Sequence, residues 1–183
     1  VGDIVVLLDS DLHMDPAQQT PENACLPGVE EQMYRIRPME DGTLEMTART
    51  TDGLWYGMTE LLQRCMRGDG VISETVTDAP ESAERTLLLD CGRKYYSREW
   101  IQNLIRCMSW RRYTSLQLHF SDAEGMKFES EKYPWLNEEQ CLSFADLEAI
   151  CATAAKYHIE IIHELDSPGH LNYIVQRFAA HAA

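Results

Sequence analysis

The sequence is short of basic residues, and this shortage narrows the range of partners. Sixteen lysines and arginines stand against thirty aspartates and glutamates, so the formal net charge of the 183-residue chain is −14. A charge of this sign opposes binding to nucleic acid or to an anionic membrane surface, and neither is expected as a partner. The acidity names no partner by itself and is an ordinary property of a solvated surface.

Two further features are absent. No apolar run approaches the ~20 residues that a membrane-spanning helix needs, so no membrane segment is expected. The six cysteines include no Cys-x-x-Cys pair, which argues against a zinc site or a disulfide framework and favours a reducing compartment. Cys65, Cys107 and Cys151 fall on predicted apolar helix faces, where a free cysteine acts as a small hydrophobic residue. Because the chain begins at Val1, a signal peptide cannot be assessed, and the location stays open between cytoplasm and export.

Residues 1–84 show the pattern of a small α+β domain. Short apolar or alternating segments, two of them flanking an Asp-Gly hairpin signal at residues 41–42, predict a few antiparallel strands. These strand candidates occupy residues 4–8, 32–37, 43–48 and 71–76. Apolar residues at helical spacing predict one helix over residues 54–65, ended by a glycine. Residues 9–29 are expected to form a loop and residues 78–84 a linker, and nothing in this part looks catalytic.

Residues 85–183 alternate between strand and helix patterns. The apolar strand candidates occupy residues 86–90, 115–120 and 159–165. Ser97 and a capping box of Ser143 with Asp146 are the predicted starts of the two helices between them. A last helix begins near Asn172. Strands linked in this way are parallel, with right-handed crossovers. Periodicity alone fits a flavodoxin-like sheet or an eight-stranded barrel, and the barrel needs about five more strands.

Side chains able to do chemistry gather where these three strands end. In parallel α/β sheets, ligands bind at the carboxyl ends of the strands. The polar residues at these ends are Asp90, Arg93, His119, Asp122, Glu124, Asp166 and His170. The sequence therefore predicts a binding or catalytic site, or part of one, at this edge of the sheet.

The acidic residues of this site have more than one interpretation. Asp122 and Glu124 can act as an acid–base pair, bind a metal ion or accept hydrogen bonds from hydroxyls, but spacing alone favours carboxylates that cap a turn. Glu164 is expected to be a satisfied interior carboxylate paired with His119 of the neighbouring strand. A lone histidine such as His119 or His163 is more often a core residue than a ligand.

The two cationic candidates are also open to more than one role. Arg93 offers a planar fork that can hold two vicinal hydroxyls, but it can equally clamp Asp90 or Asp122. His170 follows a Pro-Gly turn, which fixes it at a strand end where it can orient a carboxylate by hydrogen bonding.

Taken together, three segments resemble the β-N-acetylhexosaminidases of glycoside hydrolase family 20, in particular the bacterial branch that includes lacto-N-biosidases. The segments are Leu88-Leu-Asp-Cys-Gly-Arg-Lys-Tyr-Tyr-Ser97, Leu116-Gln-Leu-His-Phe-Ser-Asp-Ala-Glu-Gly125 and Glu164-Leu-Asp-Ser-Pro-Gly-His170. Residues 34–63 resemble the small α+β domain that precedes the barrel in that family. The resemblance implies a mixed α/β fold, in which a small α+β domain at residues 1–84 is followed at residues 85–183 by the first three βα units of a (β/α)8 TIM barrel.

The resemblance also implies a reaction and roles for residues. The family removes terminal β-linked N-acetylhexosamine, or a disaccharide ending in it, with retention, using the substrate's own acetamido oxygen as nucleophile. The expected partner is an oligosaccharide or glycoconjugate containing N-acetylhexosamine, and no cofactor or metal is expected. Arg93 would hold sugar hydroxyls, and Asp122 and His170 would organise the catalytic pair. The remaining pocket residues would be His119, Glu124 and Asp166.

The chain departs from the family pattern in several places. The family's catalytic Asp-Glu pair follows the fourth strand, and this sequence contains no Asp-Glu dipeptide, so the pair is expected beyond this chain. Met126-Lys127 stands where many members have an aromatic residue followed by arginine, and His163 replaces a common proline. Two alternatives stay open: a non-catalytic carbohydrate-binding or structural fragment, and a metal-dependent α/β hydrolase using Asp122, Glu124 and His170.

Overall fold

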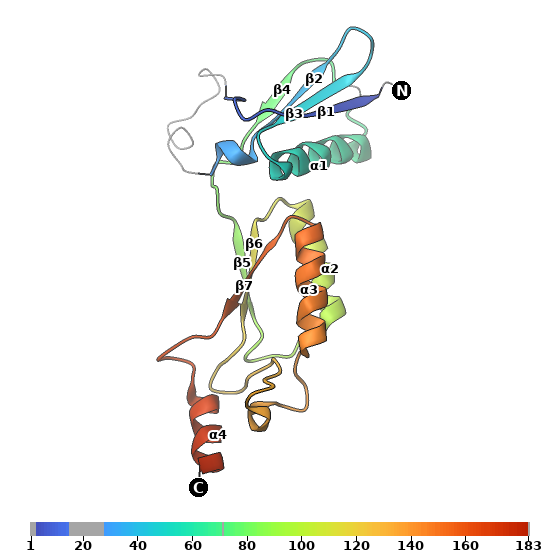
Figure 1. Ribbon diagram of the computed structural model, residues 1–183. Coiled ribbons are helices and arrows are strands. Elements are labelled where there is room, and N and C mark those ends of the chain that lie inside the picture. Colours follow the sequence, from blue (N-terminus) through green and yellow to red (C-terminus); the bar gives the residue numbers. More distant parts are fainter. Residues whose placement is uncertain (1–2, 15–27, 71, 183) are drawn as a thin grey trace. The chain divides into compact units, whose positions relative to one another are not determined.

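The computed structural model describes residues 3–14, 28–70 and 72–182. The chain folds into two compact units, unit 1 (Val1–Ala83) and unit 2 (Glu84–Ala183) (Figure 1). Cys25, most of the loop predicted for residues 9–29 and the first residue of the strand predicted at 71–76 lie outside the described residues.

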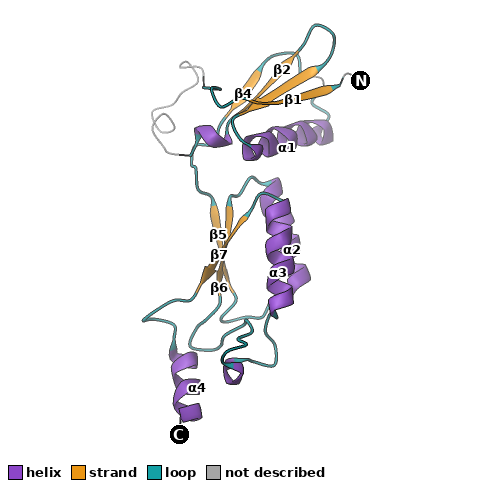
Figure 2. Ribbon diagram, viewed as in Figure 1, coloured by secondary structure: helices purple, strands orange, loops and turns teal. Residues whose placement is uncertain are grey.

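Unit 1 is a four-stranded sheet with one long helix on one face (Figure 2). Its elements are β1 (Ile4–Leu8), the 3-10 helix η2 (Glu30–Gln32), β2 (Tyr34–Pro38), β3 (Leu44–Ala48), α1 (Thr51–Arg67) and β4 (Val76–Asp78). The antiparallel hairpin of β2 and β3 confirms the prediction from the Asp-Gly pair, and Gly42 has the left-handed φ of +83° that glycine adopts without steric cost. Gly68, also left-handed, ends α1 as predicted.

Two of the strand predictions for unit 1 were wrong in part. The strand order is β1-β3-β2-β4, and β1 pairs with β3 in parallel, whereas only antiparallel pairing was expected. The strand order explains the difference, because the chain reverses direction from β1 to β2 and again from β2 to β3, and β1 lies beside β3 instead of beside β2. The last strand begins only at Val76, because Ile72 packs into the core instead of pairing with a neighbouring strand.

The helix α1 buries only part of the apolar face that the sequence predicted. Tyr34, Ile36 and Met46 are buried beneath it, and Gly57 faces them, where a Cβ atom would lie 2.9 Å from the sulfur of Met46. The glycine lets the helix approach the sheet closely. Leu61 of the predicted face is buried in the core and Leu54 packs against it, whereas Met58 and Leu62 are exposed. Cys65 is consequently exposed, which corrects its assignment to an apolar face.

Unit 2 is a parallel three-stranded sheet with two helices on one face (Figure 2). Its elements are β5 (Thr86–Asp90), α2 (Arg98–Trp110), β6 (Ser115–His119), the 3-10 helix η3 (Pro134–Leu136), α3 (Phe144–Lys156), β7 (Glu160–Glu164) and α4 (Asn172–Ala182). Ser97 caps α2, and Ser143 with Asp146 forms the predicted capping box of α3. The predicted parallel direction and helix starts are confirmed, and the strand order is β5-β6-β7.

The core of unit 2 lies between the sheet and the two helices. Ile105 of α2, Leu116 and Leu118 of β6, and Ile150 of α3 are fully buried in one cluster. Cys107 is exposed because it lies two residues beyond Ile105 and therefore faces away from the sheet, so its predicted apolar position was wrong. Cys151 is partly buried. None of the described helices is both long and apolar enough to cross a bilayer.

The cysteines give a test of this packing. Cys91, at the end of β5, is 1% exposed, and burial together with the charge of Asp90 raises the pKa of its thiol to about 12. Because the thiolate is the reactive form, iodoacetamide at about pH 8 should alkylate Cys65 and Cys107 at least ~100-fold faster than Cys91 in the folded protein. Peptide mass spectrometry after timed quenching measures each rate. Unfolding in guanidinium should remove the difference, and rapid labelling of Cys91 in the folded protein would contradict the structure.

Candidate active site

The candidate site lies at the carboxyl ends of β5, β6 and β7, where the parallel register lines up three side chains. Asp90 is the register partner of His119, and His119 is the register partner of Glu164. Residues in register on neighbouring strands project to the same side, so an acid, an imidazole and an acid form one row across the sheet end. Side chains from the loops that follow these strands contact the residues of this row.

His119 and Glu164 form the first part of the site. His119 Nδ1 lies 2.7 Å from Glu164 Oε1, and the amide of Gln117 donates to the other carboxylate oxygen. This pairing confirms the prediction for Glu164. Burial acts to lower the pKa of His119, but Glu164, by hydrogen bond and by charge, together with Asp90 and Asp122, outweighs burial and raises it. The hydrogen bond from His119 in turn lowers the pKa of Glu164.

Asp122, just after β6, is a buried carboxylate at the centre of the site, with 4% of the residue exposed. Its Oδ2 atom lies 2.7 Å from Arg93 Nη2 and 2.7 Å from His170 Nδ1, and its Oδ1 accepts from the backbone N–H of Ala123 at 2.5 Å. Burial acts to raise the pKa of Asp122, but these donors and the charges of Arg93 and His170 outweigh burial and lower it. Asp122 is therefore held as an ion.

Arg93 links the loops that follow β5 and β6. Its Nη1 donates to Asp90 Oδ2 at 2.5 Å and its Nη2 forms an ion pair with Asp122, while about half of the side chain, 49%, stays exposed. Gly92 makes this approach possible, because a Cβ there would lie 2.8 Å from the carbonyl carbon of Ser121. Both acids that the sequence offered as partners of Arg93 are bound at once.

His170 completes the network from the β7 side. Its Nδ1 contacts Asp122, and its Nε2 lies 3.7 Å from Asp166 Oδ2. The imidazoles of His119 and His170 meet edge to face, with ring centroids 5.4 Å apart. The prediction that the turn before His170 positions it to orient a carboxylate agrees with this contact.

The long loop after β6 is fastened by an ion pair that the sequence did not suggest. Lys127 pairs with Glu138, and Glu138 also accepts the backbone N–H of Met126 at 2.6 Å. Gly125 leaves room for this carboxylate, and its carbonyl accepts the N–H of Asp122 at 2.9 Å. The loop 121–142 therefore fixes the backbone of Asp122 through the carbonyl of Gly125.

The structure thus brings together most of the predicted site residues but not all of them. Arg93, His119, Asp122 and His170 are in one network, and Asp166 lies at its rim. Glu124 is exposed and, within the described part of the chain, makes no hydrogen bond or ion pair, although its charge acts on Arg93. Its expected place in the pocket stays a prediction. Sequence reasoning missed the role of Gln117, which period-two alternation with His119 could have indicated. It also missed the pairing of Lys127 with Glu138, for which the sequence carries no signal.

The same cluster has the spacing of a candidate metal site. Ligand atoms of His119, Asp122 and His170 all lie within 4.8 Å of one another. However, the Asp122 Oδ2 atom that lies beside both histidines already forms an ion pair with Arg93. A metal ion would meet repulsion from the guanidinium and would have to displace it. The arrangement therefore suits a hydrogen-bonded carboxylate–imidazole network, which can orient a polar substrate and hold or pass a proton.

The chain is similar in sequence to known proteins. The profile of Glycosyl hydrolase family 20, catalytic domain, matches residues 84–183. The beta-hexosaminidase subunit A1 of Dictyostelium discoideum is 25% identical over 142 residues, which cover 72% of this chain and 27% of that protein.

Solved structures give the same result for the fold. The β-N-acetylhexosaminidase from Bacteroides fragilis NCTC 9343 superposes with a TM-score of 0.74 at 22% identity, covering 97% of this chain and 36% of the other. A mutant Streptomyces plicatus β-hexosaminidase in complex with its product, GlcNAc, gives 0.66 at 25% identity, covering 82% and 34%. The chain has a mixed α/β fold similar to that of these enzymes, and it spans 27%, 36% and 34% of the length of these three proteins.

The pairing of His119 with Glu164 predicts a specific titration. Because the folded-state pKa of His119 is raised above 6.5, its contribution to stability is fully present below that pH and is lost as pH rises through the folded value. The lowered pKa of Glu164 means that its contribution is present above pH 4.5 and is lost as pH falls through the folded value. The stability advantage of wild type over Glu164→Gln should therefore be largest between these two pH values.

Proton NMR of the His119 ring tests the same point directly. Glu164→Gln should lower the pKa of His119, because it removes the negative charge beside the imidazole. Glu148→Gln, on the exposed face of α3, is the matched control and should leave the titration of His119 unchanged. An unchanged His119 titration in Glu164→Gln would show that the two side chains are not paired in solution.

Proposed function

The chain belongs to glycosyl hydrolase family 20, and we propose that it is part of an enzyme that removes terminal β-linked N-acetylhexosamine, or a disaccharide ending in it, from glycans. In this proposal unit 2 supplies the first three βα units of a (β/α)8 barrel, and unit 1 is the small domain before it. The site at the ends of β5, β6 and β7 is then one part of the sugar pocket.

One observation carries the proposal, the placing of Arg93 between two carboxylates. Arg93 donates one N–H to Asp90 and forms an ion pair with Asp122 through its other terminal nitrogen, and these two contacts fix the position of the guanidinium. Each terminal nitrogen keeps a second N–H, and the side chain is half exposed. A fixed fork of donors beside acceptor oxygens matches a pair of vicinal hydroxyls, the feature that distinguishes a terminal sugar.

The histidines and acids around Arg93 would act on the reaction through other groups. We assign Asp122 and His170 the role of positioning residues, because their short contact can orient a neighbouring acid–base group. In the mechanism we propose, the substrate's acetamido oxygen attacks the anomeric carbon, an aspartate orients the acetamide, and a glutamate protonates the leaving oxygen. The sequence contains no Asp-Glu dipeptide to supply those two groups.

The substrate class is proposed from the relatives. The Streptomyces plicatus enzyme is described as bound to GlcNAc as product. We propose that the same class, an oligosaccharide or glycoconjugate ending in N-acetylhexosamine, binds at the strand ends of unit 2. Which hexosamine and which linkage are preferred depends on pocket walls outside the network described above.

The first prediction from this proposal concerns the 183-residue chain alone. It should not release p-nitrophenol from p-nitrophenyl N-acetyl-β-D-glucosaminide above the rate of a buffer blank, because the general acid and the acetamide-orienting aspartate are missing from its sequence. The measurement is a colorimetric assay at high protein concentration. Turnover that rises with protein concentration and persists through repeated purification would refute the claim that the two catalytic groups lie outside this sequence.

The second prediction concerns Arg93 in a protein that continues this chain through a complete barrel. Arg93→Ala should lower kcat/KM for the same substrate by at least ~100-fold, because a fixed charged donor to the sugar is lost. Arg106→Ala removes the same charge from the exposed side of α2 and should leave kcat/KM unchanged within about twofold. Equal activity of both variants would overturn the role of Arg93, and an inactive parent protein would favour a binding or structural role over hydrolysis.

A further inference from the structure

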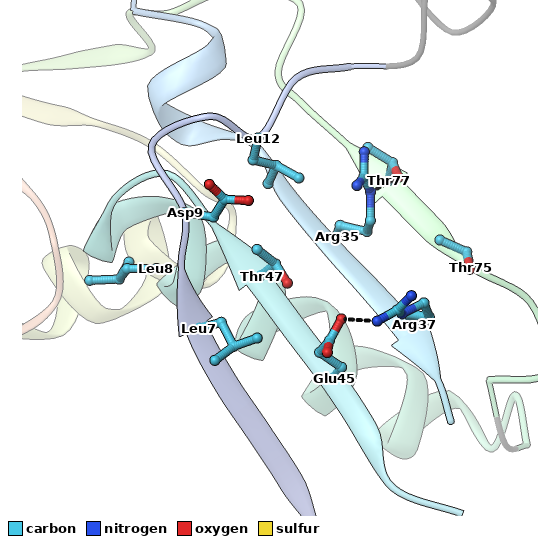
Figure 3. Close-up of a pocket in the computed structure, with 10 residues that line it drawn as sticks. All are labelled: Leu7, Leu8, Asp9, Leu12, Arg35, Arg37, Glu45, Thr47, Thr75 and Thr77. Carbon is cyan, nitrogen blue, oxygen red and sulfur yellow. Dashed lines mark hydrogen bonds and ion pairs between the residues drawn. The ribbon is translucent and has the colours of Figure 1, made fainter. Parts of the chain in front are cut away.

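The sheet of unit 1 has a second face that neither the core nor α1 uses. Residues of odd number on β2 and β3 project away from α1, because side chains alternate along a strand. They line a groove of about 740 Å³ on this face (Figure 3). This volume is within the ~300–1,000 Å³ typical of pockets for small ligands.

One row of side chains crosses all four strands in this groove. Leu7 of β1 is in register with Thr47 of β3, Thr47 with Arg35 of β2, and Arg35 with Thr77 of β4. Figure 3 shows the guanidinium of Arg35 beside Thr77, with Thr47 on the neighbouring strand. The row therefore presents a guanidinium flanked by hydroxyls, with an apolar edge at Leu7.

The charges of the groove are unevenly compensated. Arg37 is paired with Glu45 at 2.8 Å, so the second row of the groove is close to neutral. Arg35 instead donates to the hydroxyl of Thr77 at 3.3 Å and to the carbonyl of His13 at 3.0 Å. Among residues 3–14, 28–70 and 72–182, no carboxylate forms an ion pair with Arg35, although acidic residues outnumber basic ones in this chain.

We propose that this groove binds the anionic group of an acidic saccharide, a carboxylate or a sulfate ester, on Arg35. A half-buried guanidinium held by neutral acceptors is oriented but not neutralised, and it is the group best matched to a planar or tetrahedral oxyanion. Thr47 and Thr77 can donate to the same group or to ring hydroxyls, and Leu7 offers an apolar surface to the sugar ring. The choice of a saccharide rests on the proposed function.

The overall charge of the chain sets the kind of ligand. A net charge of −14 repels a long polyanion such as nucleic acid, whose binding depends on many phosphate contacts. A single anionic group would contact Arg35 at short range, where the nearby hydrogen-bond donors, and not the net charge of the chain, determine whether it binds. Asp9 also lines the groove, at the end of β1, and it accepts the N–H of Asp11 at 3.0 Å. It disfavours anions at that end, so the anionic group should sit toward β4.

The test is a titration of the ¹⁵N-labelled 183-residue chain with three sugars, followed by amide NMR shifts. N-acetylneuraminic acid carries a carboxylate, N-acetylglucosamine 6-sulfate carries a sulfate, and N-acetylglucosamine is the neutral comparison. At least one acidic sugar should shift the amides of Thr47 and Thr77, and the one that does so identifies the anionic group. Arg35→Ala should weaken this binding by at least ~10-fold, the effect of losing a charge-assisted pair.

Two further variants serve as a control for the loss of charge and as a second test that does not remove Arg35. Arg64→Ala removes the same charge from α1, where Arg64 is bound to Glu60, and should bind the acidic sugar like wild type. Thr77→Val keeps Arg35 but removes its acceptor, so it should weaken binding by about threefold even if Arg35→Ala fails to fold. The proposal is overturned if neither acidic sugar shifts these amides, if the neutral sugar shifts them equally, or if Arg35→Ala (or, should that variant not fold, Thr77→Val) binds like wild type. Binding of N-acetylglucosamine at Arg93 is followed by separate amides in unit 2, so the two proposals fail independently.

Discussion

A buried carboxylate, that of Asp122, determines how the strand ends of unit 2 are arranged. An ionised acid removed from water is costly unless cations and N–H donors surround it. Here Arg93 comes from the loop after β5, His170 from the segment after β7, and a backbone N–H from the loop after β6 itself. Satisfying one charge therefore ties together three separate segments of the chain.

The same requirement explains several local features of the sequence. Gly92 brings the loop after β5 against the backbone at Ser121, and Gly125 leaves space for the carboxylate of Glu138. Glu138 is in turn compensated by Lys127. A site whose charged groups are fixed before a substrate arrives loses little free energy in reorganising, which is the property that favours binding and catalysis. On this account the network of unit 2 is a prepared half of a sugar site.

Much of this arrangement followed from the sequence because local rules determine it. Alternating strands and helices, with caps at Ser97 and Ser143, predicted a parallel sheet, and the strand-end rule then gathered Arg93, Asp122 and His170 correctly. Features that depend on contacts between distant parts of the chain could not be predicted from the sequence in this way. The parallel pairing of β1 depends on its place beside β3 instead of beside β2, and the face that α1 buries depends on how closely Gly57 lets it approach the sheet. The place of Glu124 in the pocket stays a prediction, since the residue is exposed and acts on Arg93 only through its charge.

The central claim is that Arg93, fixed by Asp90 and Asp122, holds hydroxyls of a terminal N-acetylhexosamine. The most direct test is a crystal structure, in complex with N-acetylglucosamine, of a protein that carries this chain within a complete barrel. The account predicts two sugar hydroxyls within hydrogen-bonding distance of the Arg93 guanidinium, with its bonds to Asp90 and Asp122 unbroken. A sugar bound away from these strand ends, or an Arg93 that leaves both aspartates to reach it, would contradict the account.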